Sequence, residues 1–306
     1  MPERPPAIVA RGIQRAFGRV QALRGVDLTV PYGEVTALVG PNGAGKTTLL
    51  LILATLLMHD DGGVSVAGHD PVEDPGAVRA KIGWMPDSFG VYDQLTTDEY
   101  LTFFADAYRL PAAAAARRIA ELLELVHLTE YRHQPVHVLS RGQKQRLGVA
   151  RSLVHEPEIL LLDEPASGLD PRSRVELRDL LRGLAADGAA VLVSSHILAE
   201  LSEMADRVVF VADGVTAGEH RLDELTPATH RWRIQARDPD DLAEALSAFG
   251  VTATEAGGGH EVELDGDDAA ADLLADLVTD GVRVTAFTPL GRTLEDAYLD
   301  LTDDRR

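Results

Sequence analysis

The stretch Leu38–Leu50, LVGPNGAGKTTLL, decides the fold. It follows the apolar run Val35–Val39, which is typical of a strand, and overlaps a leucine-rich segment, Thr47–Leu57, with helical spacing. Residues 40–47 fit the pattern G-x-x-x-x-G-K-[ST], whose glycines let successive backbone N–H groups converge on phosphate oxygens. The alternative is a glycine-rich turn with an incidental Lys-Thr pair. The complete match between a strand and a helix favours a nucleotide-binding loop.

The residues of this loop have distinct expected roles. The helix that begins near Lys46 adds the positive end of its dipole to the phosphate site. The Lys46 ammonium should reach the β- and γ-phosphates, and the Thr47 hydroxyl should ligate Mg²⁺. The predicted nucleotide contacts in the loop are Gly40, Pro41, Asn42, Gly43, Ala44, Gly45, Lys46, Thr47 and Thr48.

A second apolar run, residues 159–165 (ILLLDEP), ends in two acids. A strand this apolar should lie inside a parallel sheet, with its carboxyl end at the ligand crevice. We therefore expect Asp163 to hold Mg²⁺, directly or through water, and Glu164 to polarise an attacking water. The alternative is that both acids cap the next helix.

Composition limits the class of protein. The 306 residues allow two domains of ordinary globular composition, and no apolar run approaches the roughly 18 residues of a spanning helix. The absence of cysteine excludes disulfides, thiolate zinc sites and a cysteine nucleophile. A formal charge of -20 argues against nucleic acid as a partner. The N-terminus has no apolar secretory segment, so we expect a protein inside the cell.

Residues 139–147, LSRGQKQRL, precede an amphipathic helix that should run to about Val154. Together with the two runs above, in this order, they make the chain resemble an ABC transporter ATP-binding subunit. Residues 139–143 match the LSGGQ signature of that family, with Arg141 in place of the first glycine. The resemblance implies that Ser140, Gly142 and Gln143 contact ATP, whereas Ser140 alone would also fit a plain helix N-cap.

Three further positions follow from the resemblance. Residues 167–170, SGLD, resemble the D-loop, which assigns Asp170 to the nucleotide site. His196, after the expected strand Ala190–Ser194, resembles the switch histidine that contacts the γ-phosphate. Phe17 is found where the family carries an aromatic residue that stacks on adenine; a core phenylalanine is the competing interpretation.

One position departs from the family pattern. After the expected strand Ile82–Met85 the family has a loop glutamine that senses Mg²⁺ and faces the membrane partner, whereas this sequence has Asp87. An ionised aspartate is shorter and cannot donate a hydrogen bond, although it could still meet Mg²⁺ through water. Asp87 is therefore retained as a candidate site residue, with an ordinary loop acid as the alternative.

The resemblance covers about Ile8 to Leu222 and implies an α/β P-loop ATPase domain over residues 1–225. Expected helices at about 97–110 and 112–126 would form the family's helical subdomain, within about 88–155.

Residues 226–306 follow the last nucleotide motif and are acidic, with 18 Asp or Glu against seven Arg among residues 227–306. Alternating patterns predict a small α+β domain of ferredoxin-like type. The expected strands are His230–Ala236, Glu261–Leu264 and Val282–Phe287, and the expected helices are Leu242–Phe249, Asp268–Val278 and Leu294–Leu301. The ending, TLEDAYLDLT at 293–302, resembles the daunorubicin-resistance type of ATPase.

The resemblance implies an ATP-hydrolysing subunit that drives export through a separate ABC-2-type permease. Two such subunits would dimerise, as a homodimer or with a related chain, in the cytoplasm at the inner face of the cell membrane. One alternative is a soluble ABC ATPase that acts on ribosomes or DNA. A regulator without turnover would need Glu164 or His196 replaced, and both are present.

Overall fold

The computed structural model describes residues 4–87, 90, 92, 94–225 and 231–290. These residues divide into two compact units, one ending at Leu222 and one beginning at Asp223. The predicted domain boundary, between 225 and 226, lies three residues after this division. Each unit is described by itself.

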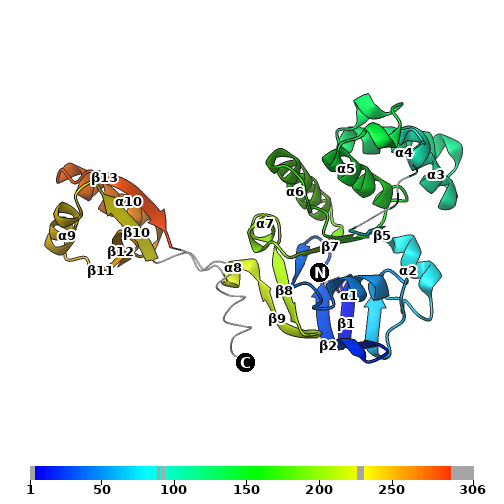
Figure 1. The fold of residues 1–306 in the computed structure, drawn as a ribbon, viewed down its shortest axis with the longest axis horizontal. Helices are drawn as coiled ribbons and strands as arrows, with labels where there is room; N and C mark the ends of the chain where they lie inside the picture. Colours follow the sequence, from blue (N-terminus) through cyan, green and yellow to red (C-terminus); the bar gives the residue numbers. More distant parts are fainter. Residues whose placement is uncertain (1–3, 88–89, 91, 93, 226–230, 291–306) are drawn as a thin grey trace. The chain divides into compact units, whose positions relative to one another are not determined.

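The first unit is built on a nine-stranded mixed sheet in the order β4-β1-β2-β9-β8-β3-β7-β6-β5 (Figure 1). Its strands are β1 Ile8–Phe17, β2 Val20–Val30, β3 Val35–Val39, β4 Asp61–Val66, β5 Ile82–Met85, β6 Ile159–Asp163, β7 Ala190–Ser195, β8 Arg207–Ala212 and β9 Val215–Arg221.

The parallel part of this sheet positions the site. Strands β3, β5, β6, β7 and β8 pair in parallel, and every residue of β3, β6 and β7 is buried. Their apolar runs suit a sheet covered on both faces. The register places Asp163, the last residue of β6, beside Ser194 of β7. The predicted strands in this part are confirmed, and their carboxyl ends meet at one edge of the sheet.

The helices of the first unit are α1 Lys46–Leu53, α2 Pro75–Lys81, α3 Thr97–Ala107, α4 Ala112–Leu125, α5 Arg141–Ser152, α6 Pro171–Ala186 and α7 Leu198–Ser202, with 3₁₀ turns η1 Thr129–Tyr131 and η2 Val136–Val138. Figure 1 shows α3, α4 and α5 packed as a group, and all three lie within residues 88–155, the range expected for a helical subdomain. Helix α1 ends at Leu53, four residues earlier than its leucine pattern indicates.

The division between the units falls within α8 Leu222–Leu225, and the second unit has a four-stranded antiparallel sheet in the order β11-β12-β10-β13. Its elements are β10 Arg231–Ala236, α9 Pro239–Ala248, β11 Ala253–Ala256, β12 Gly259–Glu263, α10 Gly266–Thr279 and β13 Val284–Pro289. This β-α-β-β-α-β order is the ferredoxin-like arrangement, so the predicted α+β class is confirmed. The strand β11 was not predicted, and the expected helix Leu294–Leu301 lies outside the described residues.

Among the described helices, none has the length and apolar character that crossing a membrane requires.

Candidate functional site

The glycine loop connects β3 to α1 in a shape that only small residues permit. Gly45 has φ +103° and precedes the first helical residue, where no side chain caps the helix. A Cβ on Gly45 would lie 2.7 Å from Ala22 O, and a Cβ on Gly40 would lie 2.1 Å from Val211 O. The N–H groups at the start of α1 therefore have no competing side-chain acceptor and can bind an anion.

Lys46, the first residue of α1, is buried, with 7% of its side chain exposed. Its ammonium donates to Gly40 O at 2.7 Å and lies 4.0 Å from Glu164 Oε1. Burial lowers the pKa of Lys46, and the nearby carboxylates of Glu164 and Asp163 oppose that change. The cation is thus held inside the loop, where it can meet phosphate.

Asp163 joins the loop to the second acidic motif. Thr47 Oγ1 donates to Asp163 Oδ2 at 2.9 Å, and Ser194 Oγ donates to Asp163 Oδ1 at 2.6 Å. Only 2% of Asp163 is exposed, so both hydrogen bonds compensate the burial of its carboxylate. The side chains of Thr47 and Asp163 thus place two oxygen ligands side by side.

Glu164 follows directly and carries a second hydrogen-bonded network. Its backbone N–H donates to Ser194 Oγ at 3.0 Å, and its Oε2 accepts from His196 Nδ1 at 2.9 Å. His196 lies just after β7 and is about half exposed. The imidazole therefore orients a carboxylate that lies within 4.0 Å of the Lys46 ammonium.

These residues face a cleft of about 460 Å³. Its lining comprises Phe17, Ala22, Asn42, Gly43, Ala44, Gly45, Lys46, Thr47, Thr48, Asp87 and Glu164. Phe17 is 48% exposed, which rules out the core alternative, and Arg15 Cζ lies 5.0 Å from its ring centroid. Asp87 is exposed in the same cleft, so the structure brings both of these candidates to the phosphate loop.

The residues of the signature segment form a separate group at the start of α5. Ser140 is the N-cap: its Oγ accepts from Gln143 N at 3.2 Å, and Gln143 Oε1 accepts from Ser140 N at 2.8 Å. This capping box still leaves the Ser140 hydroxyl hydrogen and the Gln143 amide hydrogens as donors.

Asp170 lies with this group, because it caps α6 and lines a cleft of about 620 Å³ together with Gln143. Its Oδ2 accepts from Ser173 Oγ at 2.7 Å and its Oδ1 from Ser173 N at 3.1 Å. These hydrogen bonds, the one from the hydroxyl first, lower the pKa of Asp170. The signature group and Asp170 are therefore not part of the phosphate-loop cleft of the same chain.

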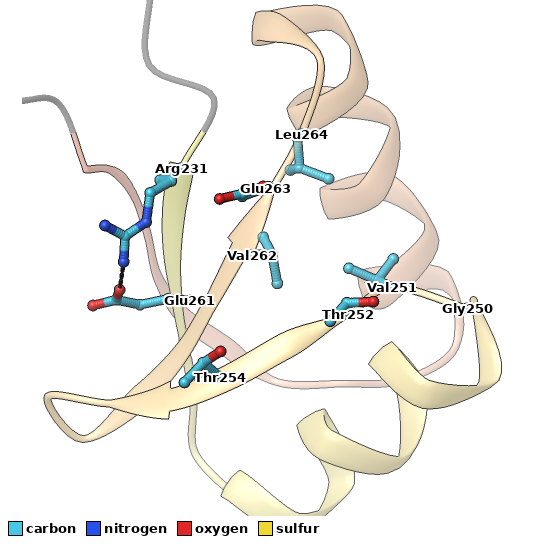
Figure 2. Close-up of a pocket in the computed structure, with 9 residues that line it drawn as sticks. All are labelled: Arg231, Gly250, Val251, Thr252, Thr254, Glu261, Val262, Glu263 and Leu264. Carbon is cyan, nitrogen blue, oxygen red and sulfur yellow. Dashed lines mark hydrogen bonds and ion pairs between the residues drawn. The ribbon is translucent and has the colours of Figure 1, made fainter.

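A larger cleft, of about 690 Å³, lies in the second unit but lacks phosphate-binding elements. Figure 2 shows its lining residues on β10–β12 and their connections, with the Arg231 guanidinium turned to Glu261 at 2.5 Å. None of its nine lining residues belongs to a helix. Volume alone therefore does not identify the site, whereas the chemistry of the phosphate-loop cleft does.

The side-chain oxygens at the phosphate-loop cleft are suitable ligands for Mg²⁺. Magnesium prefers oxygen ligands and usually retains water while it binds one or two carboxylates and substrate phosphates. Thr47 and Asp163 supply such oxygens next to the phosphate loop. Among the described residues, no group of three or more His, Asp or Glu side chains could enclose a metal by itself.

Sequence reasoning missed Ser194, which holds both Asp163 and the Glu164 backbone. Its one signal was a hydroxyl at the end of a strand that is otherwise apolar through Val193. Arg15, whose guanidinium lies over Phe17 and pairs with Asp60 at 2.5 Å, was also missed.

Comparison of the sequence with known proteins gives the same assignment. The family described as "ABC transporter" matches residues 23–167. The chain is 37% identical to the daunorubicin resistance ATP-binding protein DrrA3 of Streptomyces coeruleorubidus, over 97% of this chain and 90% of that protein. It is 34% identical to the doxorubicin resistance ATP-binding protein DrrA of Mycobacterium tuberculosis, over 97% of this chain and 88% of that protein.

Solved structures agree with the fold of the first unit. An ATP-binding subunit of an ABC transporter matches with a TM-score of 0.66 at 29% identity, over 72% of this chain and 91% of that one. A dimeric bacterial ABC transporter cassette matches with a TM-score of 0.63 at 27% identity, over 70% of this chain and 98% of that one.

Proposed function

The chain belongs to the ABC transporter family of ATP-binding subunits, and we propose that it hydrolyses Mg²⁺-bound ATP to power export of a small-molecule or lipid-like substrate through a separate ABC-2-type permease. The observation that carries this proposal is the hydrogen-bonded set at one sheet edge. It joins the phosphate-loop residues Lys46 and Thr47 to Asp163, Glu164 and His196.

Each residue of this set has a role in hydrolysis. The Lys46 ammonium and the N–H groups at the start of α1 bind the β- and γ-phosphates. Thr47 and Asp163 would hold Mg²⁺, which supplies charge neutralisation at the phosphate oxygens. Glu164 accepts a proton from the attacking water, and His196 keeps the Glu164 carboxylate oriented toward the site.

The signature group supports a dimer in which two subunits complete each other's sites. Ser140, Gly142 and Gln143 lie at the N-terminus of α5, away from the phosphate-loop cleft of their own chain. They would meet the nucleotide held by a second subunit, either a second copy or a related chain. The donors left by the capping box and the dipole of α5 suit contact with a γ-phosphate.

We propose that the permease contacts Tyr92 and helix α3. Tyr92 and Phe103 are 54% and 47% exposed, and their ring centroids lie 5.2 Å apart in an edge-to-face arrangement. Exposed aromatic pairs are common anchors of protein interfaces. Asp87, which precedes Tyr92 by five positions in the sequence, would link this contact to the nucleotide cleft.

The names of the relatives support a proposal for the class of cargo. Two proteins similar to nearly the whole chain are named for resistance to daunorubicin and doxorubicin. We infer a small, drug-like or lipid-like cargo, bound by the permease, and a subunit on the cytoplasmic face of the membrane. No observation supports the alternative role on ribosomes or DNA.

The test is the ATPase rate of purified Glu164→Gln. Removing a general base reduces turnover by roughly 10²–10⁴-fold, whereas ATP affinity should stay near that of the wild type. Because hydrolysis would separate the dimer, Glu164→Gln with Mg²⁺ and ATP should also sediment as a dimer. Glu244→Gln, an exposed acid on α9, is the matched control and should behave as wild type. Near-normal turnover of Glu164→Gln would rule out the assigned base.

A further inference from the structure

Arg141 is the signature residue whose chemistry the proposed function does not use. It is the first residue of α5, where the helix dipole disfavours a cation. Among the described residues, the hydrogen bond of its guanidinium is to a neutral hydroxyl, that of Ser167, and not to a carboxylate that would compensate this. Another contact must therefore account for the position of its guanidinium.

That contact is with the D-loop of the same chain. The guanidinium lies where a side chain on Gly168 would be: an added Cβ would come within 2.4 Å of Arg141 Cζ and 2.7 Å of its Nε. Arg141 Nη2 also donates to Ser167 Oγ in a long hydrogen bond of 3.5 Å. The planar group thus covers the bare backbone of Gly168, which has φ +70°.

The D-loop residue that Arg141 contacts is hydrogen-bonded to Glu164, the proposed catalytic base. Ser167 N donates to Glu164 O at 3.0 Å, which closes a turn from Glu164 to Ser167. Arg141 contacts the Ser167 end of this turn, and Glu164 is its first residue. A displacement of Ser167 would therefore be transmitted through one backbone hydrogen bond to Glu164.

We propose that Arg141 is a positioning residue that ties the start of α5 to the D-loop and thereby fixes the turn that presents Glu164 to the site. The inference rests on the proposed function, because it gives Glu164 its role as base. Arg141 is not among the residues that line the phosphate-loop cleft of its own chain, so its proposed effect on Glu164 passes through the turn.

Variants of Arg141 should fold, because other contacts hold the same helix pair. A Cβ on Gly142 would lie 3.0 Å from Ser173 Oγ, which shows how closely α5 rests on α6. Arg146 also pairs with Glu176 of α6 at 3.0 Å. The Ser140 capping box does not involve the side chain of Arg141.

The first experiment compares Arg141→Ala and Arg141→Lys in the full-length chain. Both should lower kcat for ATP about three- to tenfold, the range expected for coupling between contacting residues, with little change in the ATP dissociation constant. Lysine keeps the charge but lacks the planar group that covers Gly168. Wild-type kcat in Arg141→Lys would show that charge alone matters and would overturn the proposal.

The second experiment is a double-mutant cycle with Gly168→Ala. The added methyl should displace the guanidinium, so Gly168→Ala should lower kcat less in an Arg141→Ala background than in the wild type. Gly188→Ala is the matched control, because Gly188 has φ +99° and open space around its Cβ. Its effect should be the same in both backgrounds. Additive effects of Arg141→Ala and Gly168→Ala would overturn the proposed link between Arg141 and the D-loop.

Glu164→Gln measured in parallel separates the two proposals. Normal turnover in Glu164→Gln would refute the role of Glu164 as the base. It would also refute any effect of the Arg141 contact on catalysis through Glu164. Reduced turnover in Glu164→Gln, together with additive effects of the Arg141 and Gly168 variants, would refute the positioning role of Arg141 and leave Glu164 as the base.

Discussion

Glu164 is held in a backbone conformation that few non-glycine residues adopt. Its φ is +48°, in the left-handed region, which costs on the order of 1–3 kcal/mol. Hydrogen bonds from Ser167 N to its carbonyl and from its own N–H to Ser194 fix this conformation. Strain of this kind persists only where the surroundings determine it, and here it accompanies the proposed catalytic carboxylate.

Asp87 gives the prediction that tests the departure from the family pattern. If its carboxylate meets Mg²⁺ through water, Asp87→Gln should keep ATPase activity, and Asp87→Ala should lower it by about tenfold, as loss of an outer ligand contact typically does. The measurement is the ATPase rate against Mg²⁺ concentration, with and without permease. Asp187→Asn, an exposed acid at the end of α6, serves as control. Wild-type behaviour of Asp87→Ala in both assays would make Asp87 an ordinary loop acid.

The residues that could be predicted are those whose chemistry depends on local spacing. The phosphate loop and the Asp163–Glu164 pair occupy short segments with a strand beside them, so their neighbourhood is readable from the sequence. Ser194 and the Arg141 contact were not readable, because they depend on strands and loops about 30 residues apart meeting in space.

Among the strands, those with a clear local sequence pattern were predicted, and those without one were not. Strands β3, β5, β6 and β7 read as apolar runs because the sheet is covered on both faces there. Strands β1, β2 and β4 form an antiparallel part with register shifts and exposed charged residues, so their alternation is broken. Strand β11 has only four residues, ATEA, too few for a pattern.

The junction between α5 and β5 gives a prediction for pH. His155 Nε2 donates to Ile82 O at 2.8 Å, and the imidazole stacks on Tyr108 with centroids 3.7 Å apart. Burial first, and then the charge of Arg118, lower the pKa of His155, while the hydrogen bond to Ile82 opposes them. Its Nδ1 is buried without a partner among the described residues, so a proton there would have no acceptor.

A lowered histidine pKa means that the folded state disfavours the charged form. The associated stability is fully present above the unfolded pKa of about 6.5 and is lost as the pH falls below it. We therefore expect the free energy of unfolding to fall more between about pH 7.5 and about pH 5.5 in the wild type than in His155→Gln. Thermal unfolding at both pH values measures this difference. At the higher pH, His155→Gln should itself cost about 1 kcal/mol through the lost ring stacking. The exposed His133→Gln should keep the wild-type pH dependence; equal dependence in His155→Gln would contradict the prediction.

At the scale of the whole molecule, each unit has its own hydrophobic core. The core of the first unit is formed by its mixed sheet and α1, and includes Ile8, Leu38, Leu50 and Leu161. The core of the second unit is formed by the inner faces of β10, α9 and α10, and includes Trp232, Ile234, Leu246 and Leu277. Separate cores are the physical basis for units that fold independently.

This separation predicts that a chain shortened to residues 1–225 still binds ATP. The phosphate loop, Asp163, Glu164 and His196 all lie in the first unit, and their hydrogen-bond partners lie there too. We expect an ATP dissociation constant within about twofold of the full chain, since sites without shared partners act nearly independently. Residues 226–306 alone should unfold cooperatively around their own core.

The role expected for the second unit is support of the dimer or of assembly with the permease. The segment Leu294–Leu301, outside the described residues, carries a helical stripe of apolar residues that could pack on a partner or on the sheet of its own unit. Sedimentation and permease pull-down of the 1–225 chain should therefore show weaker association than the full chain, with Lys46→Ala in the full chain as the control for loss of nucleotide alone. Complete loss of ATP binding in the 1–225 chain would show that the second unit belongs to the catalytic fold, because a merely accessory domain leaves the phosphate loop and its partners in place.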